Sequence, residues 1–327
     1  MALHVGMVDG ATDLSLFRVD CGLLGVAWAL DAYGRAFVWD WRESALIAQL
    51  DAFRNPGRPE KHKSSCLLPE GVVLLSDYSL LKAWSSHGSL IAEIELNARA
   101  LRLIELDMAP VRLAVSLANG HILFFDGALK ERGCYAGPTF PAWELAQSAE
   151  IRSTLLAGYK DGIHRISLPS LACAHVTPVT RLPMYLMSHG LDLVELASGE
   201  WGRIRVDGSY APASTGALLG IANGVAWALD KLEGELVTTE YELRGDSLAP
   251  VRTHRLPEKP EWFVRSPHES LTGVLYGEHR LTFVLPGREA DSWPACTFEK
   301  PINHCAVTQT GTALVISGGQ PYRVDLE

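Results

Sequence analysis

The chain has 327 residues, of which 47% are hydrophobic and 20% are charged, and its formal net charge is −9 at pH 7. These values are typical of a globular protein and exclude a disordered chain. The negative charge argues against nucleic acid or an anionic membrane surface as the main partner, and it fits a basic protein partner better. The longest mostly apolar stretch, residues 217–229, is too short to span a bilayer.

The N-terminal residues and the cysteines both indicate a cytoplasmic protein. Residues 1–6 show no basic segment followed by an apolar one, so we expect no secretory signal. The 6 cysteines are scattered without Cys-x-x-Cys spacing, and a chain of this length can bury a large core without disulfides. We therefore expect reduced cysteines in a soluble, cytoplasmic protein.

One stretch of seven residues occurs twice in the chain. Gly-Val-Ala-Trp-Ala-Leu-Asp begins at Gly25 and again at Gly224, so the copies are 199 residues apart. This separation divides into five units of about 40 residues, which is the period of propeller blades. A Tyr-Gly turn follows the first copy and leads into residues 35–41, which predicts strand, tight turn and strand.

Groups of short predicted strands continue along the chain. The first unit has strands at 14–20, 23–30, 35–41 and 46–50, and the second at 72–75, 80–84 and 90–96. Asn119-Gly120 joins the strands of the third unit, and Asp161-Gly162 joins those of the fourth; both dipeptides are strong hairpin signals. The strands of the third unit are at 112–117 and 121–126, and those of the fourth at 154–158 and 163–168.

The second half of the chain repeats the pattern less regularly. The fifth unit is the least clear, and the last unit lacks a strand at its C-terminal end. The predicted strands of these units are 184–188, 191–196 and 201–206; 224–230, 235–243 and 251–256; 271–276 and 281–285; and 305–308, 313–316 and 322–326. An apolar segment from Leu3 to Val8 precedes the first unit, so we expect it to pair beside the C-terminal strands and remove exposed sheet edges.

The hairpin count favours eight repeating units in one domain, residues 1–327. Eight units of about 41 residues fit the period better than seven of about 47, although seven remains the alternative. No low-complexity tract or long linker divides the chain.

These repeats resemble those of WD40-type β-propellers, in a degenerate form. Trp39-Asp40 matches the closing dipeptide of a WD40 repeat, and Asp161 matches its turn aspartate. The Gly-His dipeptide of the family does not recur, so the buried Asp-His-Ser-Trp network of regular repeats cannot be assembled. The closing position holds substituted dipeptides in three further units: Trp84-Ser85, Phe125-Asp126 and Ile166-Ser167.

The resemblance implies an all-β fold, a β-propeller of four-stranded antiparallel blades. Most proteins similar to it are non-catalytic platforms that bind other proteins through the loops between blades, although a fold does not fix a function. The leading interpretation is therefore a protein–protein interaction module, a scaffold or sensor subunit of a multi-protein assembly.

No motif in the sequence fixes a reaction. The Gly-x-Ser-x-Gly elbow and the phosphate-binding Gly-x-x-x-x-Gly-Lys-Ser/Thr loop are both missing. His268-Glu269 is followed by Thr272 where a zinc site would need a second histidine. We predict no enzyme, no cofactor and no metal. The alternatives are a hydrolase or lyase, or a small-ligand binder, with its site at the central channel, which would need acidic or histidine side chains to converge from several blades.

Six residues are candidates for contact with a partner. Four basic residues lie in the polar link between the first two units, where the simpler interpretation is a solvated loop. Trp143 and Trp262 are expected in connections between blades, where an aromatic side chain either anchors a partner or seals its own blade. The four basic candidates are Arg54, Arg58, Lys61 and Lys63.

Overall fold

The structure is a computed structural model that describes residues 3–8, 16–21, 26–31, 35–50, 65–67, 73–77, 79–85, 87–256, 260–265, 271, 273–308 and 310–326. Within these ranges, only the backbone is described for residues 17, 18, 20, 21, 26, 28, 30, 65–67 and 73–77.

The described chain is almost entirely strand and forms eight four-stranded antiparallel sheets, numbered here 1 to 8 in chain order. Sheet 1 contains β2 (Leu16–Cys21), β3 (Val26–Asp31), β4 (Ala36–Asp40) and β5 (Ala45–Leu50). Sheet 2 contains β6 (Ser65–Leu67), β7 (Val73–Asp77), β8 (Leu80–Trp84) and β9 (Leu90–Glu95). Sheet 3 contains β10 (Ala100–Glu105), β11 (Leu113–Leu117), β12 (Ile122–Phe125) and β13 (Glu131–Tyr135). Sheet 4 contains β14 (Glu144–Gln147), β15 (Thr154–Tyr159), β16 (Gly162–Ser167) and β17 (Ala172–Thr177).

The second half of the chain repeats this organisation. Sheet 5 contains β18 (Pro183–His189), β19 (Leu191–Leu196), β20 (Glu200–Ile204) and β21 (Tyr210–Thr215). Sheet 6 contains β22 (Ala217–Ala222), β23 (Val225–Leu232), β24 (Glu235–Arg244) and β25 (Ser247–Arg255). Sheet 7 contains β26 (Trp262–Arg265), β27 (Gly273–Tyr276), β28 (Arg280–Val284) and β29 (Ala295–Thr297), with the short 3-10 helix η2 (Ala290–Ser292) before β29. Sheet 8 contains β30 (Ile302–Val307), β31 (Ala313–Ser317), β32 (Gln320–Leu326) and, from the other end of the chain, β1 (Leu3–Met7).

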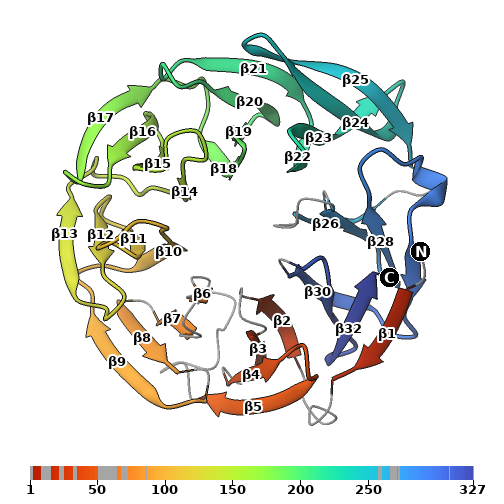
Figure 1. Cartoon of the computed structure of the whole chain (residues 1–327), viewed down its shortest axis with the longest axis horizontal. Coiled ribbons are helices and arrows are strands. Elements are labelled where there is room, and N and C mark those ends of the chain that lie inside the picture. Colours follow the sequence, from red (N-terminus) through yellow and green to blue (C-terminus); the bar gives the residue numbers. More distant parts are fainter. Residues whose placement is uncertain are drawn as a thin grey trace.

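Figure 1 shows the eight sheets following one another around a ring. In sheets 1 to 7 the first strand lies nearest the centre and the order runs outward along the chain, whereas in sheet 8 β30 lies nearest the centre and β1 is outermost. We call the eight central strands the inner strands: β2, β6, β10, β14, β18, β22, β26 and β30.

The two ends of the chain meet in sheet 8, as the sequence predicted. Leu3 to Met7 pair antiparallel with Leu326 to Tyr322, which makes β1 the outer strand of this sheet. Sheet 8 in turn packs on sheet 1, because Leu16 donates its backbone N–H to the carbonyl of Gly319 at 3.0 Å. A buried apolar cluster with Trp39 and Ile316 among its members joins the same two sheets. The first and last sheets are therefore neighbours.

Apolar side chains fill the spaces between successive sheets. Separate buried clusters join sheets 2 and 3, 3 and 4, 4 and 5, and 5 and 6, and one large cluster spans sheets 6, 7 and 8. Sheets 1 and 2 approach closely at Gly88, where an added Cβ would stand 2.7 Å from Ala48 Cβ. Gly88 also has φ of +83°, so glycine is required there for two reasons.

The closing position of the repeat has the same surroundings in four sheets. Trp39, Trp84, Phe125 and Ile166 are all buried in the third strand of their sheet. At each of them the pairing with the outer strand shifts by one residue, which is a β-bulge. The dipeptide equivalences inferred from the sequence therefore correspond to one structural position.

The two copies of the seven-residue repeat also occupy one position. Residues 26–31 form β3 and residues 225–230 lie in β23, each the second strand of its sheet. The buried network of regular WD40 repeats is missing among the described residues: the indole N–H groups of Trp39, Trp201 and Trp227 are buried without an acceptor. Asp161 instead bonds His164 Nε2 at 3.0 Å.

Candidate functional site

Five of the inner strands have a shift in their pairing close to their first residue. In sheets 1, 3, 5, 6 and 8 the pairing between the first and second strands shifts by one residue close to the start of the inner strand. In sheet 5 the shift leaves Met184 unpaired between Pro183 and Tyr185. Bulges redirect side chains, and Met184 is accordingly 50% exposed although it lies in an inner strand.

Arg102 links sheet 3 to sheet 4. It is the third residue of β10, directly after the bulge. Its Nε donates to the carbonyl oxygen of Trp143 at 3.2 Å, and its Nη2 forms an ion pair with the carboxylate of Glu144. The Arg102 guanidinium is therefore held in one orientation beside the first residue of β14.

Arg265 spans three sheets. From β26 its Nε donates to the carbonyl of Leu218 in β22 at 2.7 Å, and its Nη2 reaches Glu195 of sheet 5 at 2.7 Å. Its guanidinium carbon lies 3.5 Å from the centre of the Tyr185 ring, which is a close cation–π contact. Glu195 also accepts the backbone N–H of Leu218 at 3.0 Å, so one carboxylate ties sheet 5 to sheets 6 and 7.

We call these five side chains the inner-edge cluster: Arg102, Glu144, Tyr185, Glu195 and Arg265. All except Glu195 lie among the first four residues of an inner strand, and Glu195 pairs with Tyr185. Arg102 pairs with Glu144, and Arg265 contacts Tyr185 and Glu195. The charges of both arginines also act on Glu144 and Tyr185, so the two groups lie near each other at the end of the ring where β10, β14 and β18 begin. We call this end the inner rim.

Three large apolar side chains are exposed at the inner rim. Trp143 directly precedes Glu144, Met184 directly precedes Tyr185, and Trp262 begins β26 three residues before Arg265. Trp143 is 48% exposed and Trp262 is 63% exposed. Each of the three side chains therefore belongs to a residue within about 10 Å of a member of the inner-edge cluster, measured along the chain.

Burial controls the ionisation of the cluster. It raises the pKa of the Glu144 carboxyl, while the positive charges of Arg102 and then Arg265 act in the opposite direction. Burial also raises the pKa of Tyr185, which keeps its hydroxyl protonated at neutral pH as a hydrogen-bond donor. The cluster thus combines two paired arginines, two carboxylates and one neutral phenol.

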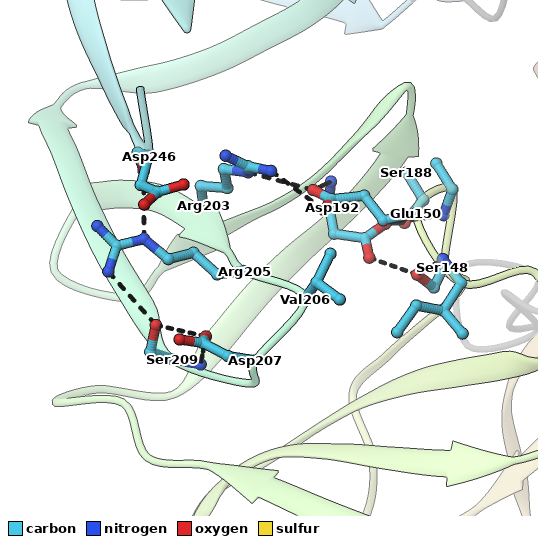
Figure 2. Close-up of polar contacts among 12 residues, drawn as sticks. Ser148, Glu150, Ser188, Asp192, Arg203, Arg205, Val206, Asp207, Ser209 and Asp246 are labelled. Atoms are coloured by element: carbon cyan, nitrogen blue, oxygen red, sulfur yellow. Dashed lines mark hydrogen bonds and ion pairs between the residues drawn. The ribbon is translucent and has the colours of Figure 1, made fainter. Parts of the chain in front are cut away.

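A second polar cluster lies at the opposite end of the inner strands, between sheets 4 and 5 (Figure 2). The buried Asp192 accepts hydrogen bonds from Ser148 Oγ at 2.5 Å, from Ala149 N at 2.8 Å and from Ser188 Oγ at 2.7 Å. Beside it, Arg203 forms two bonds to Glu150, at 3.1 and 3.2 Å. Each of these polar groups is already bonded within the cluster. The cluster therefore joins the two sheets and leaves few groups to bind a ligand.

The structure places the sequence candidates differently from one another. Trp143 lies in the connection before β14, as expected, whereas Trp262 is the first residue of β26 and not part of a connection. Neither indole seals its own sheet, because both are about half exposed or more. The basic candidates Arg54, Arg58, Lys61 and Lys63 all lie outside the described residues.

Sequence reasoning missed the inner-edge cluster. The pairs are distant in sequence, with 42 residues between Arg102 and Glu144 and 70 between Glu195 and Arg265. The signal that could have found them is a charged residue between apolar ones at the start of a unit, as in Leu101-Arg102-Leu103 and Trp143-Glu144-Leu145. The described residues contain no group of three or more His, Cys, Asp or Glu that could hold a metal ion. No helix in the described part of the chain has the length and apolarity of a membrane span.

Comparison with known proteins defines the fold but not a family. No protein-family model and no curated protein matches the chain. A crystal structure of the computationally designed Ika8 protein is similar over 96% of this chain and 97% of its own, with a TM-score of 0.70 and 10% sequence identity. At this identity the likeness shows a shared fold alone. Since 1298 chains of solved structures match, the fold selects no single function.

Proposed function

We propose that the eight sheets are the blades of one eight-bladed, WD40-like β-propeller domain comprising residues 1–327. The ring order of the sheets, the packing of sheet 8 on sheet 1 and the completion of sheet 8 by β1 support this architecture. The repeated bulge at the closing position supports the repeat relationship.

We infer that the protein is a non-catalytic protein–protein interaction module, a scaffold or sensor subunit of a larger assembly. The observation that carries this inference is the exposure of Trp143, Met184 and Trp262 at one end of the ring. Large apolar side chains that stand exposed together mark interaction sites, and tryptophan is enriched among the residues that dominate binding energy. The three residues belong to sheets 4, 5 and 7, so a partner that covers them must be of macromolecular size.

A second candidate function is a small-ligand or catalytic site at the centre of the ring. One observation favours it, namely that Glu144 is a buried acid with a raised pKa at the inner rim. Glu144 is also ion-paired with Arg102, and Glu195 with Arg265, which favours a binding surface over a free general acid. The substitution Glu144→Gln separates the two functions, because it removes the acid and leaves the three exposed apolar residues in place.

Affinity capture from the native cell tests the proposal. The purified protein and its Trp143→Ala, Met184→Ala, Trp262→Ala triple variant serve as baits, and the captured proteins are quantified by mass spectrometry. Leu90→Ser with Ile91→Ser is the matched control, because both residues are more than half exposed on the outer strand β9. We expect the triple variant to lose specific partners that the wild-type protein and the control retain. Equal capture by all three baits would contradict the proposal.

A further inference from the structure

We propose that the partner presents a carboxylate beside an apolar group, and that Arg102 and Trp143 receive this pair. This inference rests on the proposed binding function of the inner rim and adds the chemistry of the partner. The carboxylate is that of an aspartate or glutamate side chain, because the partner extends over several sheets; a carboxylate at a chain end is the other outcome of the experiment below.

The Arg102 guanidinium is oriented before any partner binds. Nε is fixed by the carbonyl of Trp143 and Nη2 by Glu144, whereas Nη1 has no partner among the described residues. A planar guanidinium matches the geometry of a carboxylate, and a side chain that is already ordered loses less entropy on binding. The free edge of Arg102 is thus a prepared donor, and the carbonyl that fixes its Nε belongs to Trp143, whose side chain is exposed.

The exposed fractions of the charged side chains determine which charge a partner contacts. The Arg102 side chain is 43% exposed, whereas its counterion Glu144 is only 9% exposed. In the other pair Arg265 and Glu195 are buried to nearly the same extent. The accessible charge at this part of the rim is therefore positive. The net charge of −9 on the whole chain has little effect here. At physiological ionic strength, salt screens the interaction between exposed charges that are more than about 8 Å apart.

The residues near Arg102 indicate which other groups the ligand must contain. The Tyr185 hydroxyl is protonated and has no hydrogen-bond partner among the described residues, so it is a second donor for an anionic oxygen. Trp143 and Met184, in adjacent sheets, supply apolar surface beside it. Among the described members of the cluster, the Glu195 side chain is only 19% exposed and that of Glu144 only 9%. A basic ligand therefore finds two donors and little accessible carboxylate beside Arg102, whereas an acidic and apolar segment satisfies each group.

Selection from random peptides tests the inference without knowledge of the natural partner. Two phage libraries are used, one with the random segment inside the displayed chain and one with a free C-terminus. We expect the first library to yield enriched peptides with an acidic residue next to an apolar one. Enrichment only of peptides with an apolar residue at a free C-terminus, in the second library, would overturn the assignment to a side chain. Enrichment of basic or uncharged peptides, or no enrichment in either library, would overturn the inference.

Variants then locate the binding of a selected peptide. Arg102→Gln alone leaves Glu144 buried without its counterion, so the double variant Arg102→Gln with Glu144→Gln removes both charges together. We expect at least a tenfold weaker affinity for this variant, by isothermal titration calorimetry. The matched control Arg152→Gln changes an exposed arginine in the connection after β14, at the other end of that strand, and should leave affinity unchanged.

The results also distinguish this inference from the proposed function. If peptide binding depends on Trp143 but not on Arg102 or on the peptide carboxylate, the rim binds partners by apolar contact alone and the inference is wrong. If selected acidic peptides bind equally well to Trp143→Ala, the proposed location at the inner rim fails as well.

Discussion

The second residue of the closing dipeptide holds the turn that follows the third strand. Asp40 accepts the backbone N–H of Arg42 at 2.9 Å, and Ser85 accepts that of Ser89 at 3.1 Å. Asp126 accepts from the backbone of both Ala128 and Lys130 at 2.9 Å. A short side-chain acceptor that satisfies turn N–H groups explains why the closing dipeptide ends in Asp or Ser.

Replacement of Asp126 tests this function of the closing residue. The Lys130 N–H, the Arg132 side chain and the Ala128 N–H hold the pKa of Asp126 below its ordinary value. The stabilisation is therefore complete above pH about 4 and is lost as the pH falls through the lowered pKa. Asp126→Ala should lower the midpoint of urea unfolding at pH 7, and the deficit should shrink in acid. A deficit that does not depend on pH would contradict this account.

Glu144 should show the opposite pH dependence. Because burial raises the pKa of its carboxyl, Glu144 binds a proton more tightly in the folded state than in the unfolded state. This contribution to stability is present below the ordinary pKa of about 4.3 and is lost as the pH rises through the raised pKa. The free energy of unfolding of the wild-type protein, minus that of Glu144→Gln, should fall as the pH rises from 4 to 7. An increase over this range would show that Arg102 outweighs burial.

At the scale of the strand, bulges protect the edges of the sheets. In sheets 1 to 6 each outer strand carries one extra residue opposite the third strand. Proline occurs in two outer strands, at Pro212 of β21 and Pro250 of β25. Bulges and prolines both oppose pairing with a further strand, so the repeated outer edges of the ring resist aggregation.

The polar joint between sheets 4 and 5 makes a measurable contribution to stability. Asp192→Ala would leave Ser148 Oγ, Ala149 N and Ser188 Oγ without their acceptor in a buried place. We expect a loss of about 3 kcal/mol in the free energy of unfolding, measured by chemical denaturation. Asp246→Ala is the control, because within the described part of the chain only the backbone carbonyl of Asp246 is bonded, to Arg205 (Figure 2). This substitution should change stability by less than about 0.5 kcal/mol.

At the scale of the whole molecule, β1 closes the ring. Without residues 1–8, β32 would lose its partner from Tyr322 to Leu326, and the core around Leu3 would open. We expect the shortened chain to unfold about 5–10 °C lower in a thermal melt. A synthetic peptide of residues 1–8 should restore the midpoint, whereas a scrambled peptide should not. An unchanged midpoint in the shortened chain would show that closure does not depend on β1.

The sequence predicted the second and third strands of every sheet, which are consecutive apolar runs. It located Trp39, Trp84, Phe125 and Ile166 at one position, and it predicted that the N-terminal segment pairs with the C-terminal strands. Among the outer strands it missed β13, β17, β21 and β29; in β21, Pro212 and the small residues lack the alternation of a buried strand.

The inner strands β6, β10, β14, β22 and β26 also escaped prediction; β6 has only three residues, and β14 and β26 have four each. The inner-edge cluster could not be predicted at all, because Arg265 and Glu195 meet only after three sheets have packed in the ring. Local patterns specify strands, whereas the site depends on the angle between sheets.

Photo-crosslinking from the inner rim tests the central claim most directly. Benzoylphenylalanine, an aromatic residue close in size to tryptophan, replaces Trp143 in the native cell, and the same residue replaces Leu90 on the outer strand β9 as the reference. On irradiation we expect covalent adducts with another protein from position 143 and none from position 90. Adducts from position 90 alone, or none from position 143, would contradict the claim that this protein binds its partners at the inner rim.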